Sequence, residues 1–153
     1  MFKFIEITRV GFLALSLAAG VGSVSLAHAA DDSTTQAQQV NVVYHINDSK
    51  AQALGGLRNM RNHLDVAPDT NIVVVAHAEG IDFLTTDYDA ADTVGPLVAG
   101  LAARGVVFEV CEITLAGRDL THDDFVLETD FTPSGVARVA QLQTQQGYAY
   151  IKP

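Results

Sequence analysis

Apolar runs with the composition of β-strands recur along the chain after residue 39. Residues 40–46 (VNVVYHI) are rich in β-branched side chains and predict a first strand. Residues 71–76 (NIVVVA) are almost continuously apolar, which is typical of a strand covered on both faces. Residues 106–110 (VVFEV) predict a third strand, and residues 148–151 (YAYI) predict an edge strand. We therefore expect a sheet with a fully buried centre.

Between these strands, apolar residues recur at spacings of three and four, which is the pattern of one helix face. Asp48 or Ser49 can cap the first helix, whose stripe consists of Leu54, Leu57, Met60, Arg61 and Leu64. The second helix starts at Asp92 or Thr93 and closes at Gly105, with the stripe Val94, Leu97, Val98 and Leu101. The third begins with Thr132 capping Pro133 and ends at Gly147, with Val136, Val139 and Leu142 facing inward.

The order strand, helix, strand, helix, strand decides the fold class. It predicts a single-domain α/β protein, a three-layer sandwich whose mostly parallel sheet of about five strands carries helices on both faces. No internal repeat and no interdomain linker interrupts residues 40–153. We expect this whole segment to form one domain.

The first residues have the features of an export signal. Lys3 and Arg9 give a basic start, residues 10–26 are apolar, and Ala27 and Ala29 are the small residues that a signal peptidase requires. We predict a signal peptide at 1–29, a disordered leader at 30–39 and a periplasmic or secreted location. The alternative is a retained membrane anchor, but the apolar stretch is short against the ~20 residues of a span. After cleavage we expect no stable association with a membrane.

The chain is acidic, with a formal net charge of −9. Loss of the basic N-terminus would make it more acidic still. Nucleic-acid binding depends on a basic face, and the sequence contains no cluster of Lys or Arg. We therefore expect no nucleic-acid partner and no attraction to an anionic membrane surface.

Cys111 is the only cysteine of the chain and directly follows the third predicted strand. In open α/β sheets, sites form outside the carboxyl ends of the strands. The other two strands end in polar residues as well, namely His45 and Asn47 after the first and His77, Glu79 and Gly80 after the second. We expect these residues to meet Cys111 at one edge of the sheet.

Each of these residues also has a structural explanation that involves no functional site. Each histidine can be satisfied by backbone groups in a polar loop, and a lone cysteine is often simply buried and inert. A metal held by His45, His77, His122 and Cys111 is conceivable, but no short ligand spacing supports it. Arg118 or a protonated histidine could lower the pKa of Cys111. Nearby acids such as Glu109 would oppose this, although we expect Glu109 to be solvated and its charge screened.

Several other chemistries lack their motifs. No glycine-rich phosphate loop follows the first strand, so the dinucleotide and P-loop fingerprints are absent. There is no serine nucleophile elbow either. We predict no cofactor and no resident metal.

Five segments in order give the chain a family resemblance. They are residues 43–47 (VYHIN), 57–64 (LRNMRNHL), 73–80 (VVVAHAEG), 108–115 (FEVCEITL) and 133–151 with PSGV at its start and GYAYI at its end. Together they resemble the DsrE/DsrF-like family. This resemblance implies a small α/β sandwich that assembles as a trimer or hexamer, and sulfur carried as a cysteine persulfide on Cys111.

The chain also departs from that family. Ala78, Glu79 and Gly80 stand where a glycine-rich turn is usual, which places a carboxylate near the site. Export would separate the protein from transfer-RNA thiolation and from the cytoplasmic sulfite-reductase pathway. The resemblance therefore leaves the sulfur donor and acceptor open.

Two hypotheses of function follow. In the first, Cys111 accepts sulfane sulfur and passes it to a protein partner, with His45 or His77 as base, Asn47 or Asn62 orienting the terminal sulfur, and Thr114 holding the loop by a hydrogen bond. In the second, the protein is a non-catalytic oligomeric binding module for a small ligand or metal, and the surface of Gly55 and Gly56 packs against another subunit.

Overall fold

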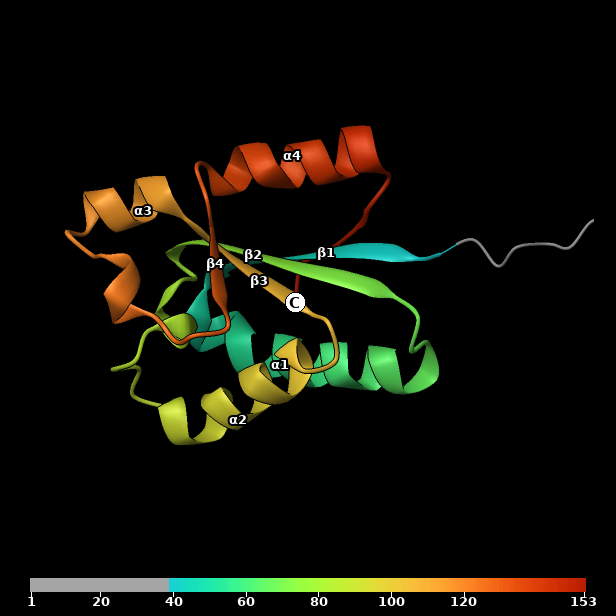
Figure 1. The fold of residues 1–153 in the computed structure, drawn as a ribbon, viewed down its shortest axis with the longest axis horizontal. Coiled ribbons are helices and arrows are strands. Elements are labelled where there is room, and N and C mark those ends of the chain that lie inside the picture. The colour runs from blue at the N-terminus through green and yellow to red at the C-terminus, as the bar shows by residue number, and fades with distance from the viewer. Residues whose placement is uncertain (1–38) are drawn as a thin grey trace, which may run out of the picture. The chain divides into compact units, whose positions relative to one another are not determined.

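A computed structural model describes residues 39–153 (Figure 1). Strands and helices alternate through this part of the chain. They are β1 (Asn41–Asp48), α1 (Ser49–Val66), β2 (Asn71–Glu79), α2 (Ala91–Ala102), β3 (Val107–Cys111), α3 (Glu112–Gly117), β4 (Thr129–Thr132), α4 (Gly135–Gln146) and β5 (Ala149–Ile151). Two short 3₁₀ turns, Asp82–Leu84 and His122–Asp124, lie in the loops.

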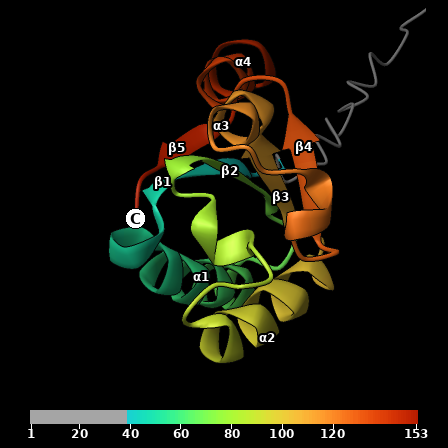
Figure 2. The ribbon, with the colours of Figure 1, turned by 90° about the vertical axis from the view of Figure 1, so that its left-hand side faces the viewer.

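The five strands form one parallel sheet in the order β4-β3-β2-β1-β5. Helices α1 and α2 cover one face of the sheet, and α3 and α4 lie on the opposite side (Figure 2). This confirms the predicted α/β sandwich with helices on both faces. The carboxyl ends of β1, β2 and β3 therefore meet at one edge, as predicted for a site.

Alternation along the strands divides the core between the two faces. On β1, Val42, Tyr44 and Ile46 belong to the larger core beneath α1 and α2. Val43 instead joins a smaller cluster with Val139 and other residues under α4. Consequently His45, next but one after Val43, projects toward the α4 side.

Helix α1 begins as predicted, since the Asp48 carboxylate accepts a hydrogen bond of 3.0 Å from the Ala51 N–H. The last helix does not. Thr132 ends β4, and α4 starts only at Gly135, with Ser134 in the N-cap position. Val139 and Leu142 are buried as predicted, but Val136, in the first turn of α4, is 61% exposed.

Three further differences concern the predicted loops. Strand β2 continues to Glu79, so His77 and Glu79 belong to the strand itself. Helix α3 and strand β4 were not predicted. The four residues of β4 (TDFT) are too few for a period-two pattern to stand out, and α3 is only six residues long.

The predicted signal peptide (1–29) and almost all of the predicted leader (30–39) lie outside the described residues. In the part of the chain that the structure describes, no helix has the length and apolar character needed to cross a membrane.

Candidate functional site

Cys111, His77 and His45 lie in a row across the α4 side of the sheet. Strand pairing brings Ala76 opposite Val110, so the next residues, His77 and Cys111, are neighbours on adjacent strands. Such strands are about 4.8 Å apart. His45 occupies the same side of the next strand, β1. The register therefore places His77 next to Cys111, and His45 lies opposite Val75, two residues before His77 on β2.

The two imidazoles contact each other directly. His45 Nε2 lies 2.6 Å from His77 Nε2, and His45 Nδ1 lies 2.7 Å from the hydroxyl of Tyr150 on β5. Burial, then the charge of Lys152, then His77 lower the pKa of His45 to about 4. Burial and Lys152 also lower the pKa of His77, which Glu79 partly offsets. Both histidines are therefore neutral at pH 7.

Residues after β5 complete the outer end of this row. The Lys152 ammonium donates a hydrogen bond to the Asn47 side-chain oxygen. Pro153 packs over Gly56 of α1, where an added Cβ would come within 3.1 Å of the proline ring. The Asn47 side-chain oxygen therefore already has Lys152 as its hydrogen-bond partner, and Gly56 packs against Pro153 of the same chain. Gly55, by contrast, has nothing near it, so only Gly55 of this pair remains open.

Cys111 is nearly covered, with 5% of its surface exposed. It ends β3 and immediately precedes α3, and Gly135 at the start of α4 lies over it. A Cβ added to Gly135 would stand 3.2 Å from the Cβ atoms of both Cys111 and His77. The absence of a side chain at residue 135 therefore lets α4 approach both candidate residues.

The surroundings of Cys111 favour its thiolate. Burial raises the pKa of the thiol, whereas hydrogen bonding from the Gly135 N–H, the Thr114 hydroxyl and the Thr114 and Ile113 N–H groups lowers it, and the net change is downward. Two residues of α3, Ile113 and Thr114, supply three of these four donors, and Gly135 of α4 supplies the fourth. A lowered pKa is typical of reactive cysteines.

Thr114 connects Cys111 to the end of β2. Its hydroxyl oxygen accepts a hydrogen bond of 3.2 Å from the Ala78 N–H, which leaves the hydroxyl proton for the sulfur. Ala78 has a φ of 50°, a left-handed conformation that is uncommon for residues other than glycine. Thr114 therefore holds a strained turn as well as the thiolate, beyond the loop contact that was predicted for it.

Replacing Thr114 with valine should raise the pKa of Cys111, because it removes a donor that stabilises the thiolate but keeps a side chain of the same shape. The rate of alkylation by iodoacetamide, measured against pH, reports this pKa. We expect the inflection of the wild-type protein to lie below that of a free thiol, about 8.5, and that of Thr114→Val to move upward. An unchanged inflection would show that the hydroxyl does not interact with the thiolate.

The structure places only some of the remaining predicted site residues near the site. Glu79 is exposed, and its charge partly offsets the lowering of the His77 pKa by burial and Lys152. Gly80 is buried against the β1 backbone, which gives it a structural role. Asn62 is not brought to the site, because it is an exposed residue of α1, on the other side of the sheet.

Glu109 differs from the expectation of a solvated acid. It is 9% exposed and forms a bidentate ion pair with Arg138 of α4, with N–O distances of 2.7 and 2.8 Å. Glu109 points to the same side of the sheet as Cys111, but its charge is matched by that of Arg138. This explains why the acid does not prevent the pKa of Cys111 from falling.

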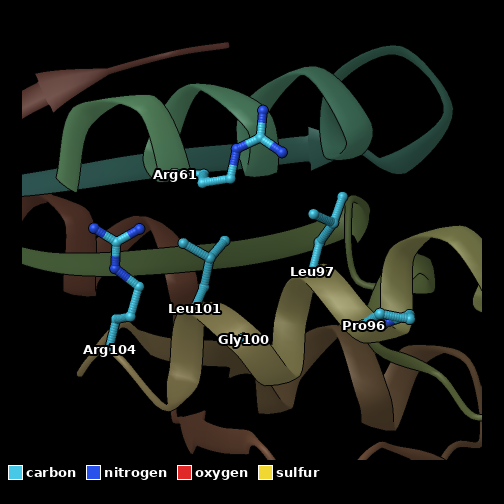
Figure 3. A pocket seen from close by; sticks show the side chains of 6 residues that line it. All are labelled: Arg61, Pro96, Leu97, Gly100, Leu101 and Arg104. Carbon is cyan, nitrogen blue, oxygen red and sulfur yellow. The ribbon is translucent and has the colours of Figure 1, made fainter. Parts of the chain in front are cut away.

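Among residues 39–153, no group of three or more His, Cys, Asp or Glu side chains is arranged to hold a metal ion. A hollow of about 270 Å³ lies elsewhere, between α1 and α2, and is lined by Arg61, Pro96, Leu97, Gly100, Leu101 and Arg104 (Figure 3). Of its two guanidinium groups, that of Arg61 comes from α1 and that of Arg104 from the turn after α2. It is remote from the row of site residues, because α1 and α2 cover the other face of the sheet.

Sequence reasoning missed Tyr150, Lys152 and Gly135. Tyr150 and Lys152 belong to an edge strand and its end, whose neighbour in the sheet cannot be read from the sequence. Gly135 carries no reactive group, so its role depends entirely on the approach of α4 to β2 and β3. No local pattern would have revealed any of the three as parts of the site.

Comparisons with known proteins agree with this architecture. The family model described as DsrE/DsrF-like family matches residues 23–153. Among six matching chains of solved structures is a protein of unknown function from Methanobacterium thermoautotrophicum, which is 31% identical, with a TM-score of 0.68 over 75% of this chain and 100% of the other. No curated protein matches significantly. The family suggests a sulfur-relay type of function. Because the family model matches residues 23–153, this chain belongs to the DsrE/DsrF-like family.

Proposed function

We propose that the protein accepts and passes sulfane sulfur as a persulfide on Cys111. The observation that carries this proposal is the environment of the thiol. Cys111 ends a central strand next to a neutral histidine, and hydrogen-bond donors lower its pKa. A nucleophilic sulfur of this kind needs a base, donors for the thiolate and a way for the donor molecule to approach.

With thiosulfate as donor, the chemistry balances without a redox partner. The Cys111 thiolate attacks the outer sulfur, an Sγ–S bond forms, the S–S bond of thiosulfate breaks, and sulfite leaves with the electron pair. The thiolate of an acceptor then attacks the terminal sulfur of the persulfide, and the Cys111 thiolate is released. His77 is the base that takes the thiol proton in the first step.

Location and assembly form part of the same proposal. The signal-peptide pattern at 1–29 supports a periplasmic or secreted protein, and family membership supports a homo-oligomer, either trimer or hexamer, that exchanges sulfur with a protein donor or acceptor. The site then acts as a sulfur carrier or sulfurtransferase outside the cytoplasm.

Mass spectrometry of the intact protein tests the proposal. After incubation with thiosulfate or polysulfide, the wild-type protein should gain the mass of one sulfur atom, and a peptide containing Cys111 should carry it. Cys111→Ser is the matched control and should gain nothing. If neither donor modifies Cys111, or if Cys111→Ser retains all cellular function, sulfur transfer is wrong and a non-catalytic binding module is favoured.

A further inference from the structure

The hydrogen-bonded chain from Tyr150 to His77 has an unassigned role. It crosses three neighbouring strands, β5, β1 and β2, and ends beside Cys111 on β3. Each imidazole has two nitrogens, and three of the four in this pair are engaged in the two contacts. The remaining nitrogen is Nδ1 of His77.

We propose that Tyr150 and His45 are positioning residues that fix the tautomer of His77, so that its free Nδ1 is unprotonated and can accept the proton of Cys111. In this arrangement the Tyr150 oxygen accepts from His45 Nδ1–H, and His45 Nε2 accepts from His77 Nε2–H. The inference rests on the proposed function and makes the C-terminal strand part of the site.

The chemistry of each group permits the proposed direction of the hydrogen bonds. A phenol oxygen can accept from an imidazole and give its own proton to water, and Tyr150 is 41% exposed. The two Nε2 atoms are 2.6 Å apart, so one proton lies between them. If that proton belongs to His77, its Nδ1 is left with a lone pair. If it belongs to His45, the neutral His77 has its proton on Nδ1 and cannot act as a base.

Burial and the charge of Lys152 keep the pair neutral. The titratable and charged groups near it are Lys152 after β5, Glu79 on β2, Tyr150 on β5 and Cys111 on β3, while Arg138 of α4 is paired with Glu109. Burial and Lys152 lower the pKa values of both histidines, so the pair remains unprotonated down to a lower pH than free histidine. When the thiol ionises, the S–H bond breaks, an Nδ1–H bond forms on His77, and the electron pair stays on sulfur.

Tyr150→Phe tests this role, because it removes the acceptor but keeps the ring. Nitrogen chemical shifts of the histidines report the tautomers. In the wild-type protein we expect His77 to be protonated on Nε2, and in Tyr150→Phe we expect a fraction protonated on Nδ1. Below the pKa of Cys111, alkylation by neutral iodoacetamide should slow by roughly tenfold, a part of what a general base contributes. Above that pKa the rate should be unchanged, because the thiolate needs no base.

Tyr44→Phe is the matched control. The Tyr44 hydroxyl also faces a histidine, at 3.5 Å from His63 Nδ1, but Tyr44 packs in the core on the α1 side of the sheet. It should leave the His77 tautomer and the alkylation profile unchanged. The inference is overturned if wild-type His77 carries its proton on Nδ1, if Tyr150→Phe leaves the tautomer as it was, or if Tyr150→Phe and Tyr44→Phe slow alkylation alike at every pH.

These readouts do not depend on sulfur transfer. A tautomer shift together with a Cys111 that never gains sulfur would retain the positioning role and reject only the proposed function. Persulfide formation on Cys111 together with an unchanged His77 tautomer would retain the proposed function and reject the positioning role.

Discussion

Gly80→Ala is expected to destabilise the protein by about 4 kcal/mol or more, in the range reserved for severe local conflicts. An added Cβ would lie 2.2 Å from the Ile46 carbonyl oxygen and 2.5 Å from the Asn47 Cα. These are backbone atoms of β1, so no side-chain rotation can relieve the clash. Urea unfolding followed by circular dichroism measures the loss in the free energy of unfolding.

The strand ends must separate to accommodate this methyl group. Gly80 lies where β2 turns away after Glu79, and its N–H donates to the His77 carbonyl at 2.9 Å. Displacing β2 from β1 would also move His77 away from His45. Gly80→Ala should therefore slow iodoacetamide alkylation of whatever folded protein remains.

Gly55→Ala provides the control for a glycine substitution as such. Gly55 lies within α1, and an added Cβ there would meet no atom within 4 Å. Because alanine is the better helix former, we expect a gain of up to about 1 kcal/mol. Equal stability of Gly80→Ala and the wild-type protein would show that β1 and β2 can separate at this point without cost.

The sequence predicts the layout of this fold well because its central strands are strongly patterned. The almost continuous apolar run at 71–76 predicts a strand covered on both faces, and β2 has this burial over residues 72–76. Given parallel strands in sequence order, the meeting of His77 with Cys111 follows from where each strand ends. The register then places both side chains on the α4 side.

What the sequence could not supply is information carried by distant partners. Glu109 was expected to be solvated because it is a charged residue near a strand end. Its burial depends on Arg138, which is 29 residues further on and on another element. Asn62 was expected to orient the terminal sulfur of a persulfide, but the phase of α1 directs it to solvent. The expectation for Glu109 fails because tertiary pairing overrides the local pattern, whereas the position of Asn62 is set by its own helix.

Arg138→Met is expected to cost about 3 kcal/mol, because it leaves the Glu109 carboxylate buried without its partner. Only 11% of the Glu109 side chain and 23% of the Arg138 side chain are exposed, and the guanidinium donates to both carboxylate oxygens. Water can therefore replace the lost hydrogen bonds only in part. The change in the free energy of unfolding, measured in urea at pH 7, gives the cost.

Two further variants separate the loss of pairing from the loss of packing. Arg104→Met removes a surface arginine whose ion pair with Asp65 is 36% and 57% exposed on its two sides, so it should cost less than about 1 kcal/mol. Replacing both buried partners, as Glu109→Leu with Arg138→Met, should recover most of the stability lost in the single variant, because no unpaired charge remains. If the double variant is as unstable as Arg138→Met, the loss in the free energy of unfolding comes from lost packing of the arginine stem against α4 and β3. It then does not come from the unpaired Glu109 carboxylate.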